Sequence, residues 1–323
     1  MPKVIPVHSS VEEAPAAVRR TCVGVAAAAR RAHPDAIAIP RLAARIAVGV
    51  DSGAFAAGSW DTAIHFVGSP EATVQYLLVL DALNFCFWPT LGFEYVQLAT
   101  RLRDVLLADA HAFDADRLAV VTPDALTAWL GEAVWPMDER ARLVREVGAV
   151  LAARFDGRAA RLVEAADGSA ARLATLVAAE LPGFRDHAVY DGRQVFFYKR
   201  AQIFAADVWG ALGGRGLGRM DDIAALTTFA DYRVPQLLRA EGAIRLAPEL
   251  AARIDALEEL PAGGAEEIEI RAATVAAVEA VRDALASLGR PMTAVEVDWR
   301  LWHRAETIRD RLPAHHRVRT VAY

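Results

Sequence analysis

The chain contains little cysteine. Only Cys22 and Cys86 occur in 323 residues, far apart and in apolar surroundings. Two isolated thiols are too few for a disulfide framework, a four-cysteine iron–sulfur cluster or a zinc site of paired cysteines. The eight histidines show no spacing typical of metal ligands, and we expect His315 and His316 on the surface. The sequence therefore predicts no metal site.

Long hydrophobic runs are also absent. The apolar segment 22–29 is far shorter than the roughly 20 residues that cross a bilayer. The N-terminus lacks the charged start and apolar core of a signal peptide. The formal charge of −5 creates no positive field that would attract nucleic acid. We therefore expect a cytoplasmic protein with no membrane partner and no stable nucleic-acid complex. The sequence does not indicate the oligomeric state.

Lysine is scarce as well. Lys3 and Lys199 are the only lysines, and every other basic residue, of 36 in total, is arginine. An interior lysine in such a chain suggests a task that arginine performs badly, such as a compact charge for a phosphate or a tunable amine. The alternative is chance retention at a solvated site.

Zinc-protease, P-loop, dinucleotide-binding and nucleophile-elbow motifs are missing from the sequence. The glycine-rich run at 213–218 follows a predicted helix rather than a strand, so it does not indicate a phosphate-binding loop.

What the chain has is helical periodicity, with 54% hydrophobic residues. Ser10 with Glu13, Ser69 before Pro70, and Thr293 with Glu296 are typical helix starts. Segment 74–80 fits a helix or a buried strand. The turn dipeptide Asp191-Gly192 predicts a hairpin. We expect one compact unit over residues 1–323, mainly α, with a small β hairpin near 189–198 and helices at 14–32, 72–87, 93–107, 124–130, 138–154, 169–180, 200–212, 234–241, 266–288 and 293–311.

One segment, residues 81–95, mixes aromatic and polar side chains. Asp81, Asn84 and Glu94 stand among five aromatic residues. Aromatic faces can stack on a flat heterocycle, while a carboxylate and an amide can bind its polar edge. A helix end packed into the core is the alternative. The aromatic residues are Phe85, Phe87, Trp88, Phe93 and Tyr95.

Asp231 precedes a predicted helix, with Tyr232 and Arg233 beside it. A carboxylate in this place can be a helix N-cap, or it can stabilise an oxocarbenium ion and position a water. Lys199, at the start of another helix, indicates either a phosphate site or a solvated basic turn. Asp298 stands beside Trp299 on a third helix, as a ligand contact or a satisfied core group.

Four segments together resemble the queuosine salvage proteins. They are LVLDALNFCFWP at 78–89, YKRAQIFAADVW at 198–209, FADYRVPQ at 229–236 and VDWRLW at 297–302. In addition, Leu181-Pro182-Gly183 resembles the hairpin of helix-hairpin-helix DNA glycosylases. The resemblance implies a two-lobed, DNA-glycosylase-like fold, with the active-site cleft between an N-terminal helical lobe and a lobe around 138–245. It also implies hydrolysis of queuosine 5′-monophosphate to queuine and ribose 5-phosphate, without a metal or an organic cofactor.

The resemblance and the chemistry together suggest roles for eleven residues. Asp231 would act on the ribose side, as electrostatic stabiliser, water base or nucleophile. The base edge or the side-chain amine of queuine would be bound by Asp81, Asn84 or Asp298. The base ring would lie between Phe85, Trp88, Phe229 and Trp299. The 5′-phosphate would be held by Lys199, Arg233 and Tyr232. A DNA-base glycosylase and a non-catalytic nucleotide-binding helical protein remain as alternative functions.

Overall fold

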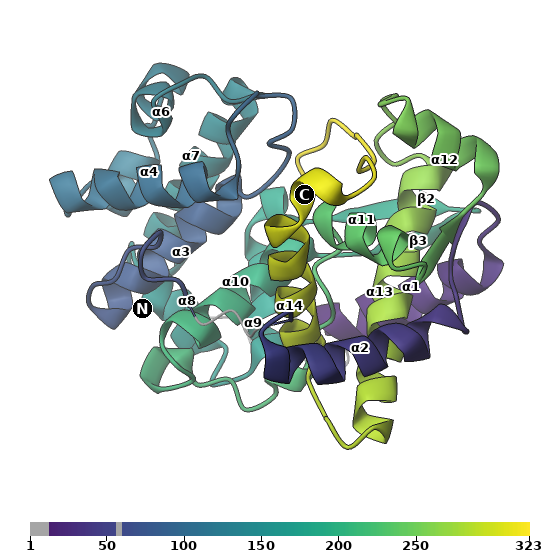
Figure 1. Ribbon diagram of the computed structural model, residues 1–323. Coiled ribbons are helices and arrows are strands. Elements are labelled where there is room, and N and C mark those ends of the chain that lie inside the picture. Colours follow the sequence, from purple (N-terminus) through teal and green to yellow (C-terminus); the bar gives the residue numbers. More distant parts are fainter. Residues whose placement is uncertain (1–12, 56–59) are drawn as a thin grey trace.

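The structure, a computed structural model, describes residues 13–55 and 60–323. It is mainly helical, with two small antiparallel sheets, so the predicted fold class is confirmed. Figure 1 shows α4, α6 and α7 on one side of the molecule and α12 and α13 on the other, with α10 and α14 between them. No helix of the described residues is long and apolar enough to cross a bilayer.

Ten helices lie close to their predicted positions, whereas α2, α5, α8 and α12 were not predicted. Their bounds are α1 Ala14–Ala28, α2 Ala38–Ser52, α3 Pro70–Leu83, α4 Tyr95–Ala108, α5 Ala115–Leu118, α6 Pro123–Leu130, α7 Met137–Arg154, α8 Ala159–Ala165, α9 Ala170–Glu180, α10 Lys199–Ala211, α11 Arg233–Ala240, α12 Pro248–Asp255, α13 Ala265–Ser287 and α14 Ala294–Thr307. Short 3-10 turns occupy Pro182–Phe184, Gly216–Gly218, Ile223–Ala225 and Arg309–Arg311.

Helix starts follow the predicted capping signals. The Ser69 hydroxyl accepts from the backbone N–H of Ala72, and Thr293 with Glu296 forms a capping box. Three helix ends were predicted too late. The first predicted helix ends at Ala28, the second at Leu83 and the last at Thr307. Ser10, the predicted first cap residue, lies outside the described residues.

Four strands form two pairs. The predicted hairpin is present as β2, His187–Tyr190, against β3, Arg193–Phe196. The pairing of β1, Ala32–Pro34, with β4, Ile244–Leu246, was not predicted. It joins segments more than 200 residues apart, and each strand has only three residues, too few for a visible alternation of apolar and polar side chains.

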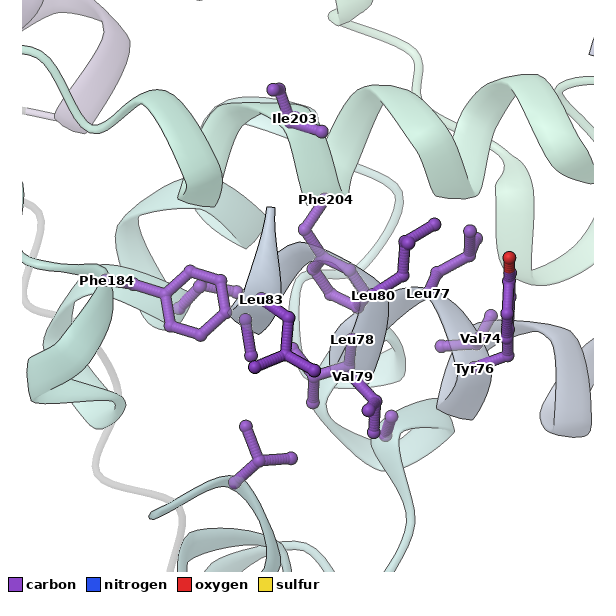
Figure 2. Packing of buried hydrophobic residues seen from close by; sticks show 14 of the residues in the cluster. Val74, Tyr76, Leu77, Leu78, Val79, Leu80, Leu83, Phe184, Ile203 and Phe204 are labelled. Carbon is purple, nitrogen blue, oxygen red and sulfur yellow. The ribbon is translucent and has the colours of Figure 1, made fainter. Parts of the chain in front are cut away.

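Helix α3 forms the centre of the largest hydrophobic cluster. Every residue from Tyr76 to Leu83 is buried, so the helix has no polar face. This explains why periodicity alone did not distinguish a helix from a buried strand. Figure 2 shows its side chains gathered with Phe184 and with Phe204 of α10. The same cluster contains side chains of α7 and α9, so helices that were predicted in different lobes share one core. The division into two lobes stays a prediction.

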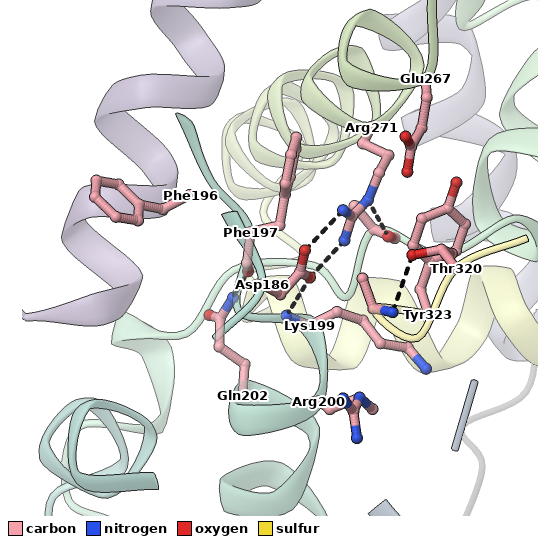
Figure 3. A network of polar contacts seen from close by, with 12 residues as sticks. Asp186, Phe196, Phe197, Lys199, Arg200, Gln202, Glu267, Arg271, Thr320 and Tyr323 are labelled. Carbon is pink, nitrogen blue, oxygen red and sulfur yellow. Dashed lines mark hydrogen bonds and ion pairs between the residues drawn. The ribbon is translucent and has the colours of Figure 1, made fainter. Parts of the chain in front are cut away.

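A buried ion pair connects this core to α13 (Figure 3). The Arg271 guanidinium donates to both carboxylate oxygens of Asp186, at 2.8 and 2.6 Å. Its Nε donates to the carbonyl oxygen of Ala230 at 3.0 Å. Asp186 in turn accepts from the backbone N–H of Lys199 through Oδ2, at 3.1 Å. The ring of Phe197 lies 3.9 Å from the guanidinium carbon. One ion pair therefore fixes the positions of three separate segments.

Substituting Arg271 with methionine should destabilise the protein strongly, because it leaves the Asp186 carboxylate buried without its partner. We expect the free energy of unfolding to fall by about 3–5 kcal/mol, measured by urea denaturation. The control is Arg290→Met, which breaks the exposed pair with Asp51 and should change the stability little. Equal effects of the two substitutions would contradict this role for the buried pair.

Candidate active site

One cavity of about 320 Å³ collects most of the predicted site residues. Its wall is built from the turn after α3, the starts of α4 and α11, one face of α10, and α14. Nine of the eleven residues singled out from the sequence line it: Asn84, Phe85, Lys199, Phe229, Asp231, Tyr232, Arg233, Asp298 and Trp299. These residues come from segments more than 200 positions apart in the chain, which the fold brings together.

The turn after α3 is held by buried arginines. Arg140 donates to the carbonyl oxygens of Leu83 and Phe85, each at 2.7 Å, and of Cys86 at 3.2 Å. Arg200 donates to the carbonyl oxygen of Ala82 at 2.6 Å. These bonds satisfy carbonyl groups at the end of a buried helix, which otherwise would lack partners. The two guanidinium carbons lie 4.1 and 5.1 Å from the centre of the Phe85 ring, so this ring packs against protein cations.

Lys199 is buried at the first position of α10. The residue before it, Tyr198, has a left-handed backbone with φ of 48°, a conformation costly for a bulky residue. The Lys199 ammonium donates to the backbone oxygen of Asn84 at 2.8 Å and lies 3.4 Å from the Asn84 side-chain oxygen. Burial lowers the pKa of Lys199 to about 8, and the negative charge of Asp231 opposes this effect. The lysine is therefore an amine with a tunable charge beside the catalytic candidate.

Asp231 has one fixed and one unpaired carboxylate oxygen. Its Oδ1 accepts from the backbone N–H groups of Arg233 and Val234, at 2.8 and 2.9 Å. This is the capping geometry that the sequence suggested, at the start of α11. Its Oδ2 has no hydrogen bond to any residue in the described ranges 13–55 and 60–323. Burial raises the pKa of Asp231, and Lys199 opposes the rise. The cap and the cavity wall thus use the same side chain.

Asp298 holds the loop before Asp231 against α14. Its Oδ1 accepts from the hydroxyl of Thr228 and from the backbone N–H of Phe229, the latter at 2.9 Å. Burial raises the pKa of Asp298 to about 7. Phe229 is placed on the cavity wall by these bonds. The proposed contact of Asp298 with the base stays a prediction.

Arg233 and Tyr232 already have protein partners. The Arg233 side chain is paired with Glu306 through Nε and donates to Gln236 at 2.9 Å. Its other terminal nitrogen lies 3.7 Å from Glu94. The ring of Tyr232 stacks on His315, with 4.6 Å between the ring centres. The neighbouring His316 is buried, so the expectation of a surface position was wrong for that residue; its ring packs on Tyr323, which lines the cavity.

Two predicted residues, Asp81 and Trp88, do not line the cavity. Asp81 is fully buried on α3, and neither carboxylate oxygen has a hydrogen-bond partner among the described residues. Trp88 lies beyond the turn, where its indole N–H donates to the backbone oxygen of Val318 at 3.2 Å. Guanidinium groups of Arg317 and Arg319 lie over its ring. The turn at Cys86, with a left-handed φ of 43°, redirects the chain between the two.

The sequence interpretation did not include several acidic and aromatic residues on the cavity wall, and the acidic ones are Asp61, Asp207 and Glu306. Asp207 follows Lys199 and Ile203 at intervals of four, and all three line the cavity. That spacing places side chains on one helical face and could have identified Asp207. Of the aromatic residues, Trp60 and His65 gave no such signal. Tyr95 belongs to the aromatic segment 81–95 and Trp302 to the segment 297–302, but neither was assigned a role. Among the described residues, no group of three or more metal-ligating side chains is arranged to hold an ion.

Comparisons with known proteins identify the family. A family model described as queuosine salvage protein matches residues 64–323. The chain belongs to the queuosine salvage protein family. The resemblance found in the four sequence segments is thereby confirmed.

Three members illustrate the range of similarity within the queuosine salvage family. A protein of Dictyostelium discoideum is 49% identical over 253 residues, which cover 78% of this chain and 79% of the relative. A protein of Sphaerobacter thermophilus is 46% identical over 281 residues, covering 82% and 86%. A Bos taurus protein is 35% identical over 277 residues, covering 77% and 81%. Each of the three is named queuosine 5′-phosphate N-glycosylase/hydrolase.

Two tryptophan substitutions should separate wall residues from buried neighbours. Trp88→Phe is expected to lower the free energy of unfolding by about 1 kcal/mol, because it loses one hydrogen bond, and to leave ligand binding unchanged. Trp299→Ala removes part of the cavity wall and should weaken binding. Urea denaturation and titration with queuosine 5′-phosphate, the compound in the relatives' name, measure both effects. Weaker binding in Trp88→Phe than in Trp299→Ala would place Trp88 at the ligand.

Proposed function

We propose that this protein hydrolyses the N-glycosidic bond of queuosine 5′-monophosphate and releases queuine for salvage in tRNA modification. One observation carries the assignment to this cavity: the half-buried carboxylate of Asp231, fixed through Oδ1 and unpaired at Oδ2, lines the cavity together with Lys199. The family membership and the activity named for the relatives agree with the function expected from the sequence. The cytoplasmic location expected from the sequence is part of the same proposal.

The chemistry explains the need for a carboxylate. Queuine is a 7-deazapurine and has no N7 that could be protonated, so its glycosidic bond is hard to break. As that bond breaks, positive charge develops on the ribose and negative charge on the base, and an enzyme must stabilise both. Asp231 would stabilise the ribose, activate water or attack as a nucleophile. Each of the three roles requires its ionised form, which the Lys199 ammonium favours.

The shape of the wall suits a planar base. Phe229, Tyr95, Trp299 and Trp302 line the cavity. Aromatic faces can stack on any planar base, because every base has a π-face. Asn84 contributes an amide at the inner wall, where its side chain is 8% exposed. We therefore keep Asn84 and Asp298 as candidates for the polar edge of the base. Phe85 lines the cavity too, although cations lie over its ring.

The 5′-phosphate would be bound by the cations of the wall. Lys199 is the only lysine among the described residues, and it lines the cavity. Arg233, two residues after Asp231, lines the cavity as well. Because Arg233 is paired with Glu306, a phosphate would compete with this carboxylate, whereas the Lys199 ammonium contacts only neutral oxygens of Asn84. Lys199 is therefore the stronger candidate. Binding of a remote phosphate can be used to raise turnover.

A DNA-base glycosylase is less well supported. The turn that resembles a helix-hairpin-helix motif lies between α9 and the β2–β3 hairpin rather than between two helices. The Gly183 N–H donates to Glu146 at 2.6 Å, and its carbonyl oxygen accepts from Arg200. These backbone groups are satisfied inside the protein, so they are not available to a DNA phosphate. A non-catalytic binding protein would bind queuosine 5′-monophosphate without releasing product.

The decisive assay incubates the chelator-treated protein with queuosine 5′-monophosphate, guanosine 5′-monophosphate and queuosine, and reads products by mass spectrometry. We expect queuine from the first and little base from the second. Asp231→Asn should lower turnover at least about a hundredfold while the protein stays folded, because the neutral amide cannot stabilise the ribose cation. Near-normal turnover in a folded variant would refute the role of Asp231.

Lys199→Met tests the phosphate site. If Lys199 binds the phosphate, the preference for the nucleotide over the nucleoside should fall by about tenfold or more, since a charge-assisted contact is worth roughly 1.5–3 kcal/mol. Because Lys199 also lowers the pKa of Asp231, the acidic limb of the pH–rate profile should move to higher pH. An unchanged preference with a shifted limb would assign Lys199 to Asp231 alone.

A further inference from the structure

Asp207 is a buried carboxyl group that faces the cavity without a partner. It is 5% exposed and lines the cavity wall. It has no hydrogen bond or ion pair with any residue for which the structure gives a position. Buried polar side chains in folded proteins are normally hydrogen-bonded. An unsatisfied one at a cavity wall therefore indicates a group whose partner is a ligand.

A second unpaired carboxyl group lies behind it. Asp81, on α3, is fully buried, and α3 packs against α10. Neither oxygen of Asp81 has a hydrogen bond of ordinary geometry in the described part of the chain, although the Asn84 side chain lies close enough to lower its pKa. Burial, and then the charge of Asp207, raise the pKa of Asp81 well above its ordinary value. Two carboxyl groups in this environment cannot both be ionised.

Burial and the charge of Asp298 favour the protonated form of Asp207. Asp81 and Tyr76 face it from α3, Tyr95 from α4 and Asp298 from α14, while Lys199 is the cation on its own helix. Burial raises the pKa of Asp207, and only Lys199 opposes the rise. A neutral Asp207 carries a proton that it can donate, whereas an ionised one would repel a departing anion.

The positions of Lys199 and Asp207 on α10 suggest which end of the cavity binds which part of the substrate. Lys199 and Asp207 are eight residues apart, which corresponds to roughly 12 Å along a helix. Lys199 is influenced most strongly by Asp231, among the charged groups around it, so its end of the wall faces the ribose. The other end, with Asp207, then faces the base.

We propose that Asp207 is a catalytic residue of the hydrolysis and protonates the departing base. This inference rests on the proposed function. The bond from C1′ to the base nitrogen breaks, and its electron pair goes to the base, which takes the proton of Asp207. A water molecule adds its oxygen to C1′ and releases one proton, which replaces the one that Asp207 donated. The products are queuine, whose ring system is now neutral, and ribose 5-phosphate.

Asp207→Asn, measured as kcat and KM over a range of pH, tests this role. We expect kcat to fall by about 10²–10⁴ with KM changed less than about threefold. In the wild type, kcat should fall as the pH rises above neutrality, because only protonated Asp207 acts; the variant should lose this fall. Lys199 also titrates there, so Lys199→Met is measured too, and in it the fall should persist.

The opposite pH dependence would overturn the proposal. An Asp207 carboxylate that binds the cationic amine of queuine would make activity rise with pH, and its loss would raise KM. The control is Asp116→Asn, at an exposed position of α5. Queuine binding and the unfolding midpoint report whether Asp207→Asn is folded. If it is not folded, the wild-type pH profile distinguishes the two roles of Asp207: activity that falls with pH supports the acid, and activity that rises with pH overturns it. Queuine release by the wild type tests the proposed function separately, and its absence overturns both proposals.

Discussion

The buried pair of Arg271 and Asp186 determines the geometry on which the active site depends. Arg271 binds the carbonyl group directly before Asp231, and Asp186 binds the backbone of Lys199. The distance between the lysine and the aspartate is thereby set by one guanidinium–carboxylate contact, in a place that water does not reach. Bidentate geometry suits this task, because two parallel hydrogen bonds fix orientation as well as distance. A lysine in place of Arg271 would provide the charge without this orientation.

The cavity wall and α3 behind it together contain more aspartates than the single lysine of the wall can compensate. Asp81, Asp207, Asp231 and Asp298 each have a raised pKa with burial as the main cause. Their hydrogen bonds divide them into two kinds. Asp231 and Asp298 accept backbone N–H groups, which favour a carboxylate, whereas Asp81 and Asp207 accept none. A site that separates charge between a sugar and a base needs both an anion and an acid.

Local sequence signals predicted most of the fold, because capping and turn chemistry act over a few residues. Ser69 and Thr293 began helices where expected, and the Asp191-Gly192 turn closed the hairpin. The end of α3 was misplaced because it depends on Arg140, more than fifty residues later. Chain direction after that helix depends on the backbone of Cys86, which no pattern reveals.

The candidate site was predicted largely from the four family segments, which cover the cavity wall at several points. Trp88 was included because the sequence shows that a residue is aromatic but not in which direction its side chain points. The turn after α3 places the Trp88 ring away from the cavity. Asp207 was not predicted, although it lies within the segment 198–209 and at helical spacing from Lys199. Trp60 and His65 reach the wall through tertiary structure alone.

The burial of every residue from Tyr76 to Leu83 of α3 has a consequence for synthesis of the chain. A helix without a polar face cannot remain in water by itself, and its partners arrive late. The carbonyl oxygen of Ala82, for example, accepts a hydrogen bond from Arg200, which is synthesised 118 residues later. At translation rates of about 5–20 residues per second, this delay is on the order of ten seconds. During that time the apolar side chains of the nascent segment lack their partners, which is the condition under which shielding by the ribosome or by chaperones protects a chain from aggregation.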